Sequence, residues 1–544
     1  MKKILFSIMA LIASVSAFGC TNVIVGKKAS ADGSVFVSYN ADSYGMYGNI
    51  YHHTGGTHQK GEMRKVYEWD TNKYLGEIPQ AERTYNVVGQ MNENQVSICE
   101  TTFGGRMELA DSTAIIDYGS LIYIGLERAT SARDAIKIMT DLVAKYGYYS
   151  EGESFSVCDK NEAWILEMIG KGPGNKGAVW VAVRIPDDCV SAHANQSRIT
   201  RFNMKDKKNV MYSKDVIKFA RDKGYFSGKD SEFSFRDAYN PLDFGGVRYC
   251  DTRVWSIFNR LCGGMEQYVD YAKGNDLKGE MPLYLKPKQP VTLQDVMGCM
   301  RDHYEGTPFD IQNEIGAGPY NMPYRPTPLS FECGKKKYFN ERPISTQQTG
   351  FCFVGQMRSN LPDYCGGIAW VTNDDSNMAP FVPLYCSIPE VPKCFQKIEG
   401  KQDDVTFSWE SAFWIQNAVS NMVYPYYDKM FPDLKERRDS YEESVMSAMS
   451  LNEGVWPTMD DQELAKKNFA GFSATWANLM MTYWNDLYKY LVVKHLDMAV
   501  KKVDDKGNFL KTTDGLSQPP ARPGYPEAYR QQIVKETGDK YLMK

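Results

Sequence analysis

The feature that most constrains this chain is the pattern of residues 1–20. Two lysines precede an apolar run over residues 4–17, and the small residues Ala17 and Gly19 follow. This is the pattern of a cleaved export signal, because the apolar run is too short to cross a membrane. Cleavage after Gly19 would make Cys20 the first residue, with a thiol and a free α-amine on one Cα. A nucleophile and a base in one residue form a minimal catalytic unit.

The residues after Cys20 predict a hairpin that returns a carboxylate to it. Residues 21–25 (TNVIV) predict an apolar strand, and residues 34–40 (SVFVSYN) alternate as a second strand after an Asp-Gly turn. Pairing the two strands places Cys20 opposite residues 40–42. Asp42 is therefore the first candidate catalytic partner of Cys20.

The composition is that of a globular protein with a nearly balanced charge. Of the 544 residues, 43% are hydrophobic, 13% aromatic and 24% charged, and the formal net charge is −4. This charge gives no reason to expect a nucleic acid as partner. No later stretch reaches the roughly 20 apolar residues of a membrane helix. We therefore expect a periplasmic or secreted protein with no stable membrane insertion after cleavage; its oligomeric state is left open.

Strand and helix signals alternate along most of the chain. Ser131 is a predicted cap for a helix that runs to about residue 145. Strands are predicted over residues 154–159, 163–168, 178–185, 190–194 and within 350–386; helices over 213–221, 252–261, 293–301, 409–446 and 462–501. This order predicts an α+β fold of stacked sheets covered by helices. We expect a signal peptide over residues 1–19, a core over 20–400 and a helical region over 401–544 packed on that core.

The cysteines and histidines do not predict a metal site or another cofactor. The twelve cysteines contain no C-x-x-C pair, and the histidines at positions 52, 53 and 58 lack an accompanying H-E-x-x-H motif. Either His193 or His303 could serve an internal cysteine as in papain, but no local signature accompanies such a pair. Several later cysteines could form disulfides in an exported protein, with a connectivity that the sequence leaves open.

Cys20 has a second interpretation, as the acylated first residue of a lipid-anchored binding protein. Two features argue against it. Bulky Phe18 and Ala17 precede the cleavage site, where a lipoprotein usually has leucine at the position of Ala17. An apolar strand follows Cys20 at once, without a polar tether.

Ordered blocks of the sequence resemble the bacterial cysteine dipeptidases of the dipeptidase A type. These enzymes belong to the N-terminal-nucleophile hydrolase superfamily and are related to bile salt hydrolase and penicillin V acylase. The resemblance extends from Cys20 to about Pro392. It rests on residues 20–33, Tyr39-Asn-Ala-Asp42, Gly89-Gln-Met-Asn-Glu93, Glu100-Thr-Thr102, Ala194-Asn-Gln-Ser-Arg198, Thr252-Arg-Val-Trp255, residues 301–310, Tyr320-Asn-Met-Pro-Tyr-Arg325 and Pro383-Leu-Tyr385.

The resemblance implies a four-layer αββα sandwich and a set of partners for Cys20. Asp42 matches the carboxylate that orients the N-terminal amine, and Asn195 matches the asparagine that binds the oxyanion and the amine. Arg253 matches the arginine near the nucleophile, where a cation lowers the thiol pKa. The second oxyanion donor of the acylases aligns near Thr102.

One position departs from the acylase pattern. Tyr39 stands where those enzymes have an arginine three residues before the aspartate, so no arginine role is carried over to it. The expected function is hydrolysis of dipeptides through a Cys20 thiolate and a thioester, without a cofactor. The alternatives are an amidase that cleaves bile salts, penicillin V or N-acyl amides, and the lipid-anchored binding protein.

Overall fold

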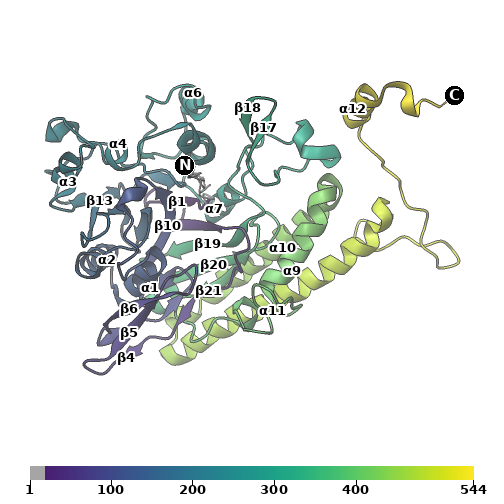
Figure 1. The fold of residues 1–544 in the computed structure, drawn as a ribbon. Helices are drawn as coiled ribbons and strands as arrows, with labels where there is room; N and C mark the ends of the chain where they lie inside the picture. The colour runs from purple at the N-terminus through teal and green to yellow at the C-terminus, as the bar shows by residue number, and fades with distance from the viewer. Residues whose placement is uncertain (1–18, 544) are drawn as a thin grey trace, which may run out of the picture.

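The computed structural model describes residues 19–543, so all of the predicted signal peptide except Gly19 lies outside the described residues. Two antiparallel sheets form the centre of the molecule (Figure 1). The seven-stranded sheet has the order β16 (Tyr284–Leu285), β14 (Val190–His193), β1 (Asn22–Val25), β2 (Val35–Asp42), β19 (Thr349–Met357), β20 (Gly367–Asn373), β21 (Val382–Tyr385). The eight-stranded sheet has the order β15 (Val210–Tyr212), β13 (Ala178–Ile185), β12 (Ala163–Gly170), β11 (Gly152–Cys158), β10 (Ser97–Gly104), β9 (Met91–Asn92), β8 (Val87–Val88), β3 (His52–His53).

The central strands are buried on both faces, which explains their nearly continuous apolar sequences. β1 and β2 contact β10, and β2 also contacts β11, so the two sheets face each other across a shared hydrophobic core. Helices α1 (Tyr118–Arg128) and α2 (Ala132–Tyr146) cover the outer face of the eight-stranded sheet through a second apolar cluster. Ser131 caps α2 as predicted, since its side chain accepts a hydrogen bond from the Asp134 backbone N–H.

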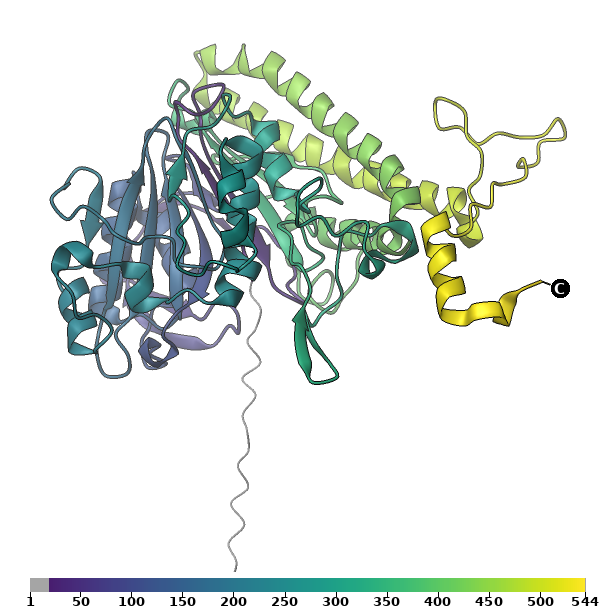
Figure 2. The same cartoon turned by 90° about the horizontal axis from the view of Figure 1, so that it is seen from above.

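The outer face of the seven-stranded sheet is covered by helices from two parts of the chain. α5 (Thr252–Leu261) contacts β14, and α7 (Leu293–Met300) contacts β2 and β19. The C-terminal helices α9 (Ala412–Val423), α10 (Tyr427–Glu453) and α11 (Gln462–Lys494) pack against β20 and β21. Figure 2 shows the sheets edge-on, with the long helices along one side. The fold is therefore α+β, with antiparallel sheets and a helical C-terminal region.

Shorter elements complete the fold. Three two-stranded ribbons are formed by β4 (Gly56–Thr57) with β7 (Arg83–Thr84), β5 (Met63–Tyr67) with β6 (Tyr74–Pro79), and β17 (Ser330–Cys333) with β18 (Lys336–Phe339). The remaining α-helices are α3 (Val216–Asp222), α4 (Phe235–Tyr239), α6 (Val269–Ala272), α8 (Asp363–Gly366) and α12 (Glu527–Thr537). In both ribbon views α12 lies away from the two sheets (Figures 1 and 2).

The predicted long C-terminal helices are shorter than expected. The segment 409–446 is divided at Tyr424–Tyr426, a 3₁₀ turn that contains Pro425, whose missing N–H weakens a continuous helix at this point. Pro432, by contrast, lies inside α10 without ending it. The predicted helix 462–501 ends at Lys494. Asp497 and Met498 adopt φ values of 57° and 59°, which a right-handed helix excludes.

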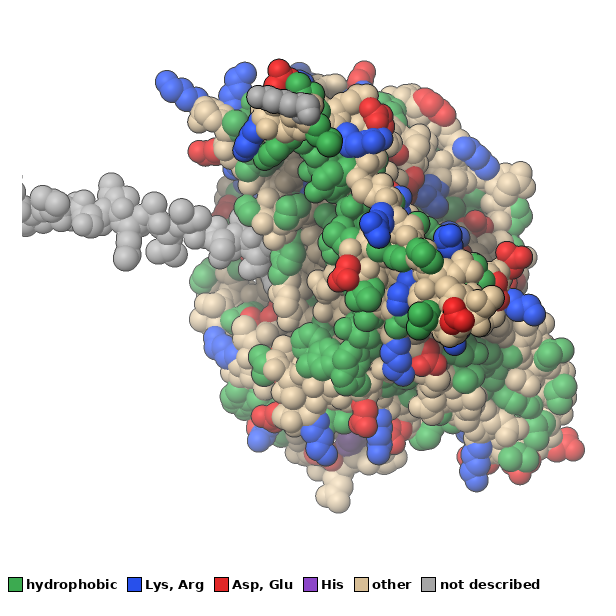
Figure 3. All heavy atoms as spheres, turned by 90° about the vertical axis from the view of Figure 1, so that its right-hand side faces the viewer, with side chains coloured by type: hydrophobic (Ala, Val, Ile, Leu, Met, Phe, Trp, Pro, Cys, Tyr) green, Lys and Arg blue, Asp and Glu red, His purple; other side chains and the backbone are tan. Residues whose placement is uncertain are grey.

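Three further observations concern the surface charge, the cysteines and the possibility of a membrane helix. On the face shown in Figure 3, side chains of both charges are interspersed. All twelve cysteines lie in the described part of the chain, and none of them forms a disulfide. Among residues 19–543, no helix combines the length and apolar character that crossing a bilayer requires.

Candidate active site

Cys20 lies just before β1 and is buried between the two sheets, with 4% of its surface exposed. The predicted hairpin is confirmed, because β1 pairs with β2 and Thr21 forms a bridge with Asn40. The backbone N–H of Gly19 donates to the carbonyl oxygen of Asp42 (3.0 Å). Cys20 therefore lies beside the end of β2, where the sequence predicted that Asp42 would be.

The Asp42 carboxylate is buried, and both of its oxygens have partners. Arg342 donates to Oδ2 (2.6 Å) and Thr349 donates to Oδ1 (2.6 Å). Burial raises the pKa of Asp42, and the Arg342 guanidinium opposes that effect. Arg342 also donates to the carbonyl oxygen of Gly19. The guanidinium beside Asp42 thus comes from the segment before β19, 300 positions away in the sequence, and no local motif predicts it.

Arg253 joins the Cys20 segment to the loop that follows β14. It is the second residue of α5, directly after a π-helical turn over Gly246–Asp251. One guanidinium nitrogen donates to the carbonyl oxygens of Gly19 (3.0 Å) and Cys20 (2.5 Å). The other nitrogen donates to Ala194 O and Asn195 Oδ1, both at 3.0 Å. Burial, reinforced by the charge of Arg342, lowers the pKa of Arg253 to about 10, so the group stays charged at neutral pH.

The backbone conformation of Asn195 and its side-chain hydrogen bonds fix the orientation of its amide group. Its φ is +65°, a left-handed conformation that asparagine tolerates better than most residues. The side-chain Nδ2 donates to the backbone oxygen of Thr102 (2.8 Å). The Thr102 hydroxyl donates to Glu153 Oε1 (2.8 Å), so its single proton is already engaged. The structure therefore brings Thr102 beside Asn195 through its backbone, and its hydroxyl group contacts an acid.

Two residues on the other side of the Cys20 thiol had no predicted role. The Cys20 Sγ lies 3.5 Å from Glu100 Oε1 and 3.8 Å from the Tyr39 hydroxyl oxygen, and Tyr39 donates to the same Glu100 oxygen. Burial raises the pKa of the thiol well above its ordinary value, and the carboxyl groups of Glu100 and Asp42 raise it further. In a chain that still carries Gly19, the thiol is therefore protonated.

A weak sequence signal points to this acidic side. Glu100 and Thr102 are two positions apart in β10, so their side chains share one face of the sheet. Glu153 in β11 is paired directly with Thr102. Polar side chains at a spacing of two on one face of a buried strand would have indicated a lined site, but the sequence does not show that β11 is the neighbour.

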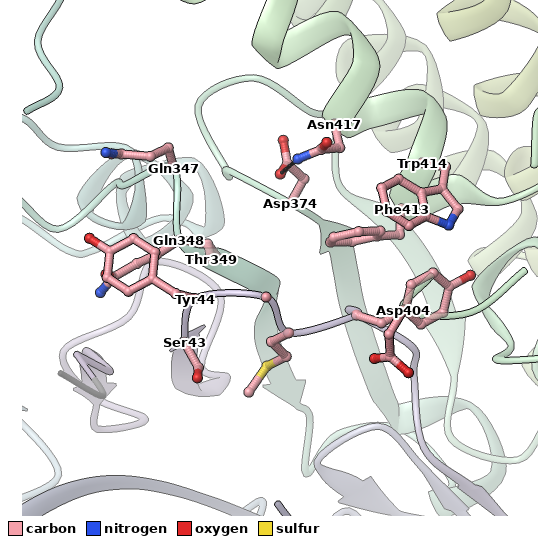
Figure 4. Close-up of a pocket in the computed structure, with 13 residues that line it drawn as sticks. Ser43, Tyr44, Gln347, Gln348, Thr349, Asp374, Asp404, Phe413, Trp414 and Asn417 are labelled. Carbon is pink, nitrogen blue, oxygen red and sulfur yellow. Dashed lines mark hydrogen bonds between the residues drawn. The ribbon is translucent and has the colours of Figure 1, made fainter. Parts of the chain in front are cut away.

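A separate cavity of about 200 Å³ lies beyond Asp42 (Figure 4). Its wall includes Ser43, which follows Asp42, and Thr349, which donates to the Asp42 carboxylate. Burial raises the pKa of Asp374 at this cavity to about 7, and Asn417 donates to that carboxyl group (2.8 Å). The thiol of Cys20 does not line the cavity, so the candidate active site is the cluster between the sheets.

Three of the histidines contact hydroxyl groups, and the His303 ring lies 3.0 Å from Glu305 Oε1. His193 is buried against Ser156 and Thr101, with a distance of 2.7 Å to each hydroxyl oxygen. Burial lowers its pKa to about 3, so it is neutral and does not pair with a cysteine. His53 and His58 both contact the Thr84 hydroxyl. Within residues 19–543 no group of three or more His, Cys, Asp or Glu side chains is arranged to hold a metal ion.

Comparison with known proteins places the chain in a family. The sequence model of Peptidase family C69 matches residues 19–60 and 55–440 of this chain. A "Probable dipeptidase" of Salmonella dublin is 27% identical over 411 residues, covering 71% of this chain and 85% of that protein. A "Probable dipeptidase" of Latilactobacillus sakei is 25% identical (75% of this chain, 81% of that protein), and "Dipeptidase A" of Lactobacillus helveticus is 24% identical (79% and 86%). The chain belongs to peptidase family C69.

Proposed function

We propose that this protein is an exported cysteine-type dipeptidase whose nucleophile is Cys20 at the N-terminus of the mature chain. The observation that carries the proposal is the buried Cys20, with Asp42, Arg253 and Asn195 gathered around the Gly19–Cys20 bond. The substrate class is supported by the relatives named as dipeptidases, which match this chain over most of their own length.

Cleavage at Gly19 would create the catalytic base. While Gly19 is attached, the Cys20 nitrogen belongs to an amide and cannot accept a proton, and the raised pKa keeps the thiol protonated. Release of Gly19 turns that nitrogen into an α-amine with an ordinary pKa of about 7.7–8.0. Near neutral pH this amine is partly unprotonated, so it can take the thiol proton.

The small residue at position 19 supports cleavage directly after it, because signal peptidase requires a small residue there. From the leader pattern we infer export to the periplasm or to the outside of the cell.

The proposed reaction proceeds through a thioester. The Cys20 thiolate attacks the carbonyl carbon of the first residue of the dipeptide, and the protonated α-amine returns its proton to the leaving nitrogen as the C–N bond breaks. Water then attacks the thioester, releasing the first amino acid and restoring the thiol. Each donor aimed at the oxyanion contributes roughly 3–4 kcal/mol.

Four side chains have proposed roles in this reaction. Asp42 orients the α-amine, and Asn195 donates to the oxyanion. Arg253 fixes the Cys20 carbonyl and the Asn195 amide, and its charge favours the thiolate form of Cys20. Because the Thr102 hydroxyl is engaged with Glu153, we assign Thr102 to the positioning of that acid.

The finer description of the fold is also a proposal. Two facing sheets with helices on each outer face support the four-layer αββα sandwich of the N-terminal-nucleophile hydrolases. We propose residues 20–400 as this core and residues 401–544 as a helical region, of which α9, α10 and α11 pack on the core and α12 lies away from it. The family match continues to residue 440, which indicates that α9 and the start of α10 accompany the core in this family.

The burial of Cys20 argues against the lipid-anchored alternative. A diacylglycerol linked to Sγ has no room where only 4% of the residue is exposed. An anchor also needs a surface residue, whereas Cys20 lies between two sheets.

The test compares substrates and variants of the mature protein. Wild type should hydrolyse a panel of dipeptides, whereas Cys20→Ala and a form with Met retained before Cys20 should both be inactive. The matched control is Cys333→Ala, which changes an exposed cysteine and should keep full activity. Full activity of the Met-extended form would contradict the mechanism. Faster hydrolysis of bile salts, penicillin V or N-acyl amides than of dipeptides would replace the dipeptidase with an acylase.

A further inference from the structure

Two buried acids beside the Cys20 thiol have no cationic partner. Glu100 and Glu153 are each 1% exposed, and the Oε2 atom of each has no hydrogen-bond partner. Among residues 19–543 no lysine, arginine or histidine forms an ion pair with either one. Glu167 provides the contrast, since this buried acid accepts hydrogen bonds from Ser197 and from the backbone N–H of Arg198.

Burial raises the pKa of both acids. The charge of Glu100 and a hydrogen bond between the two carboxyl groups raise the pKa of Glu153 further, so the protonated form of Glu153 is favoured without a ligand. A buried carboxylate without a cation or sufficient donors is strongly disfavoured in a folded protein. The hydroxyl group of Tyr148 has no partner either; burial raises its pKa, and the charge of Glu153 raises it further. Each acid thus has a vacant carboxyl oxygen, which is the kind of acceptor that the N–H donors of an ammonium group need.

The distance from the thiol identifies which ammonium fits. A carbonyl carbon about to be attacked lies roughly 3–3.5 Å from the sulfur. In a peptide with a free N-terminus, the α-nitrogen is only about 2.5 Å from that carbonyl carbon, because two bonds separate them. Glu100 Oε1 lies 3.5 Å from Cys20 Sγ. A substrate whose first carbonyl is at the thiol therefore has its α-ammonium within reach of the acids.

We propose that Glu100 and Glu153 form the subsite that binds the α-ammonium group of the first substrate residue. This inference rests on the proposed dipeptidase function and deepens it, because it makes a free N-terminus a requirement for hydrolysis. A substrate that is acylated at this nitrogen leaves both buried acids without a cation. Sites built around a polar substrate group reject an analogue that lacks the group by about 10⁴–10⁵-fold.

Glu153 is the better residue to change, because Glu100 also contacts the thiol. Glutamine has the same shape as glutamate and removes the charge. The two substrates are Ala-Ala and propionyl-Ala, which differ only in the α-ammonium group. For Glu153→Gln we expect kcat/KM for Ala-Ala to fall about 100-fold, mainly through a higher KM. The rate for propionyl-Ala should not fall, and alkylation of Cys20 by the neutral reagent iodoacetamide should keep its rate.

The matched control is Glu151→Gln, the same change two positions earlier in the chain at a half-buried acid that does not contact Cys20. It should leave both substrates unaffected. In wild type, propionyl-Ala should react at least 1,000-fold more slowly than Ala-Ala, a comparison that needs no variant to fold.

The outcomes separate this inference from the function on which it rests. If wild type cleaves Ala-Ala but Glu153→Gln is unimpaired, or loses both substrates equally, the subsite is wrong and the dipeptidase stands. Equal rates of wild type on the two substrates would overturn the subsite in the same way. If wild type cleaves no dipeptide, the proposed function itself fails.

Discussion

The two sides of Cys20 differ in how their acids are compensated. On one side, the Asp42 carboxylate has a guanidinium and a hydroxyl donor, and Arg253 lies close by on the backbone of Cys20. On the other side, Glu100 and Glu153 have no cation within the described residues, and each has a vacant oxygen. The first side is complete within the chain, whereas the second is complete only when a positively charged group enters.

This difference distinguishes charged groups that are buried in an ion pair, and so stabilise the fold, from acids that are buried without a partner because function requires them. A buried ion pair loses much stability when one partner is removed, because the other charge stays behind. Buried acids without a partner reduce stability from the outset and persist where function requires them. On the Asp42 side, loss of the ion-pair partner Arg342 should therefore reduce stability, whereas changes at Glu100 and Glu153 should mainly alter substrate preference.

The largest effect is expected on the paired side. Arg342→Met leaves the Asp42 carboxylate buried without its cation, and we expect the free energy of unfolding to fall by about 3–5 kcal/mol. Chemical denaturation of the mature protein measures this change. Arg342→Lys is the control that keeps the positive charge, and it should recover part of the lost stability. If Arg342→Met were as stable as wild type, the ion pair between Arg342 and Asp42 would not stabilise the fold.

A smaller effect on stability, seen as the pH is lowered, tests whether a protonated His193 is the cation that Glu100 and Glu153 lack. Burial holds its pKa near 3, against about 6.5 in the unfolded chain, so it is neutral in both states above about pH 6.5. Below that pH the unfolded state binds the proton first, and stability is lost as the pH falls from about 6.5 towards 3. Between pH 7 and pH 5 the loss from this residue should be about 2 kcal/mol.

The measurement is the free energy of unfolding of wild type and His193→Gln at pH 7 and pH 5. The variant should lose less stability than wild type over this interval, because glutamine does not titrate. Equal losses for the two proteins would mean that folding does not lower the pKa of His193, and a protonated His193 would then become a candidate cation for the two acids.

The smallest effect has the opposite sign from the first. Glu153→Gln replaces a buried carboxyl group that has no cation with a neutral amide, so we expect stability to stay unchanged or to rise by at most about 1 kcal/mol, with no fall in the melting temperature. Thermal unfolding without substrate measures it. A destabilisation as large as that of Arg342→Met would show that the two sides of Cys20 do not differ.

The sequence predicts local structure here better than it predicts the site. The hairpin of β1 and β2 follows from alternation and an Asp-Gly turn, and it brings Asp42 to Cys20 without other information. The break at Pro425 was only partly readable, because proline disfavours a helix interior and yet Pro432 lies inside α10. Arg342 was not, because its contact with Asp42 spans 300 positions and depends on the pairing of β2 with β19.

The acidic side could be predicted even less. Cys20 and Glu100 are 80 positions apart and lie in different sheets, so only the contact between the sheets brings them together. Glu153 joins them because β11 is the neighbour of β10, in a register that pairs it with Thr102. Strand alternation gives the face of a side chain but not the identity of the facing sheet.

The most direct test of the central claim is the N-terminal residue of the active enzyme. The protein is produced with its leader in an exporting host, the active fraction is isolated, and its N-terminus is read by Edman degradation and intact mass. The account predicts that all dipeptidase activity belongs to molecules that begin at Cys20 with a free α-amine, and that molecules retaining Gly19 have none. Activity in molecules that retain Gly19, or in molecules with an acylated Cys20 amine, would contradict it.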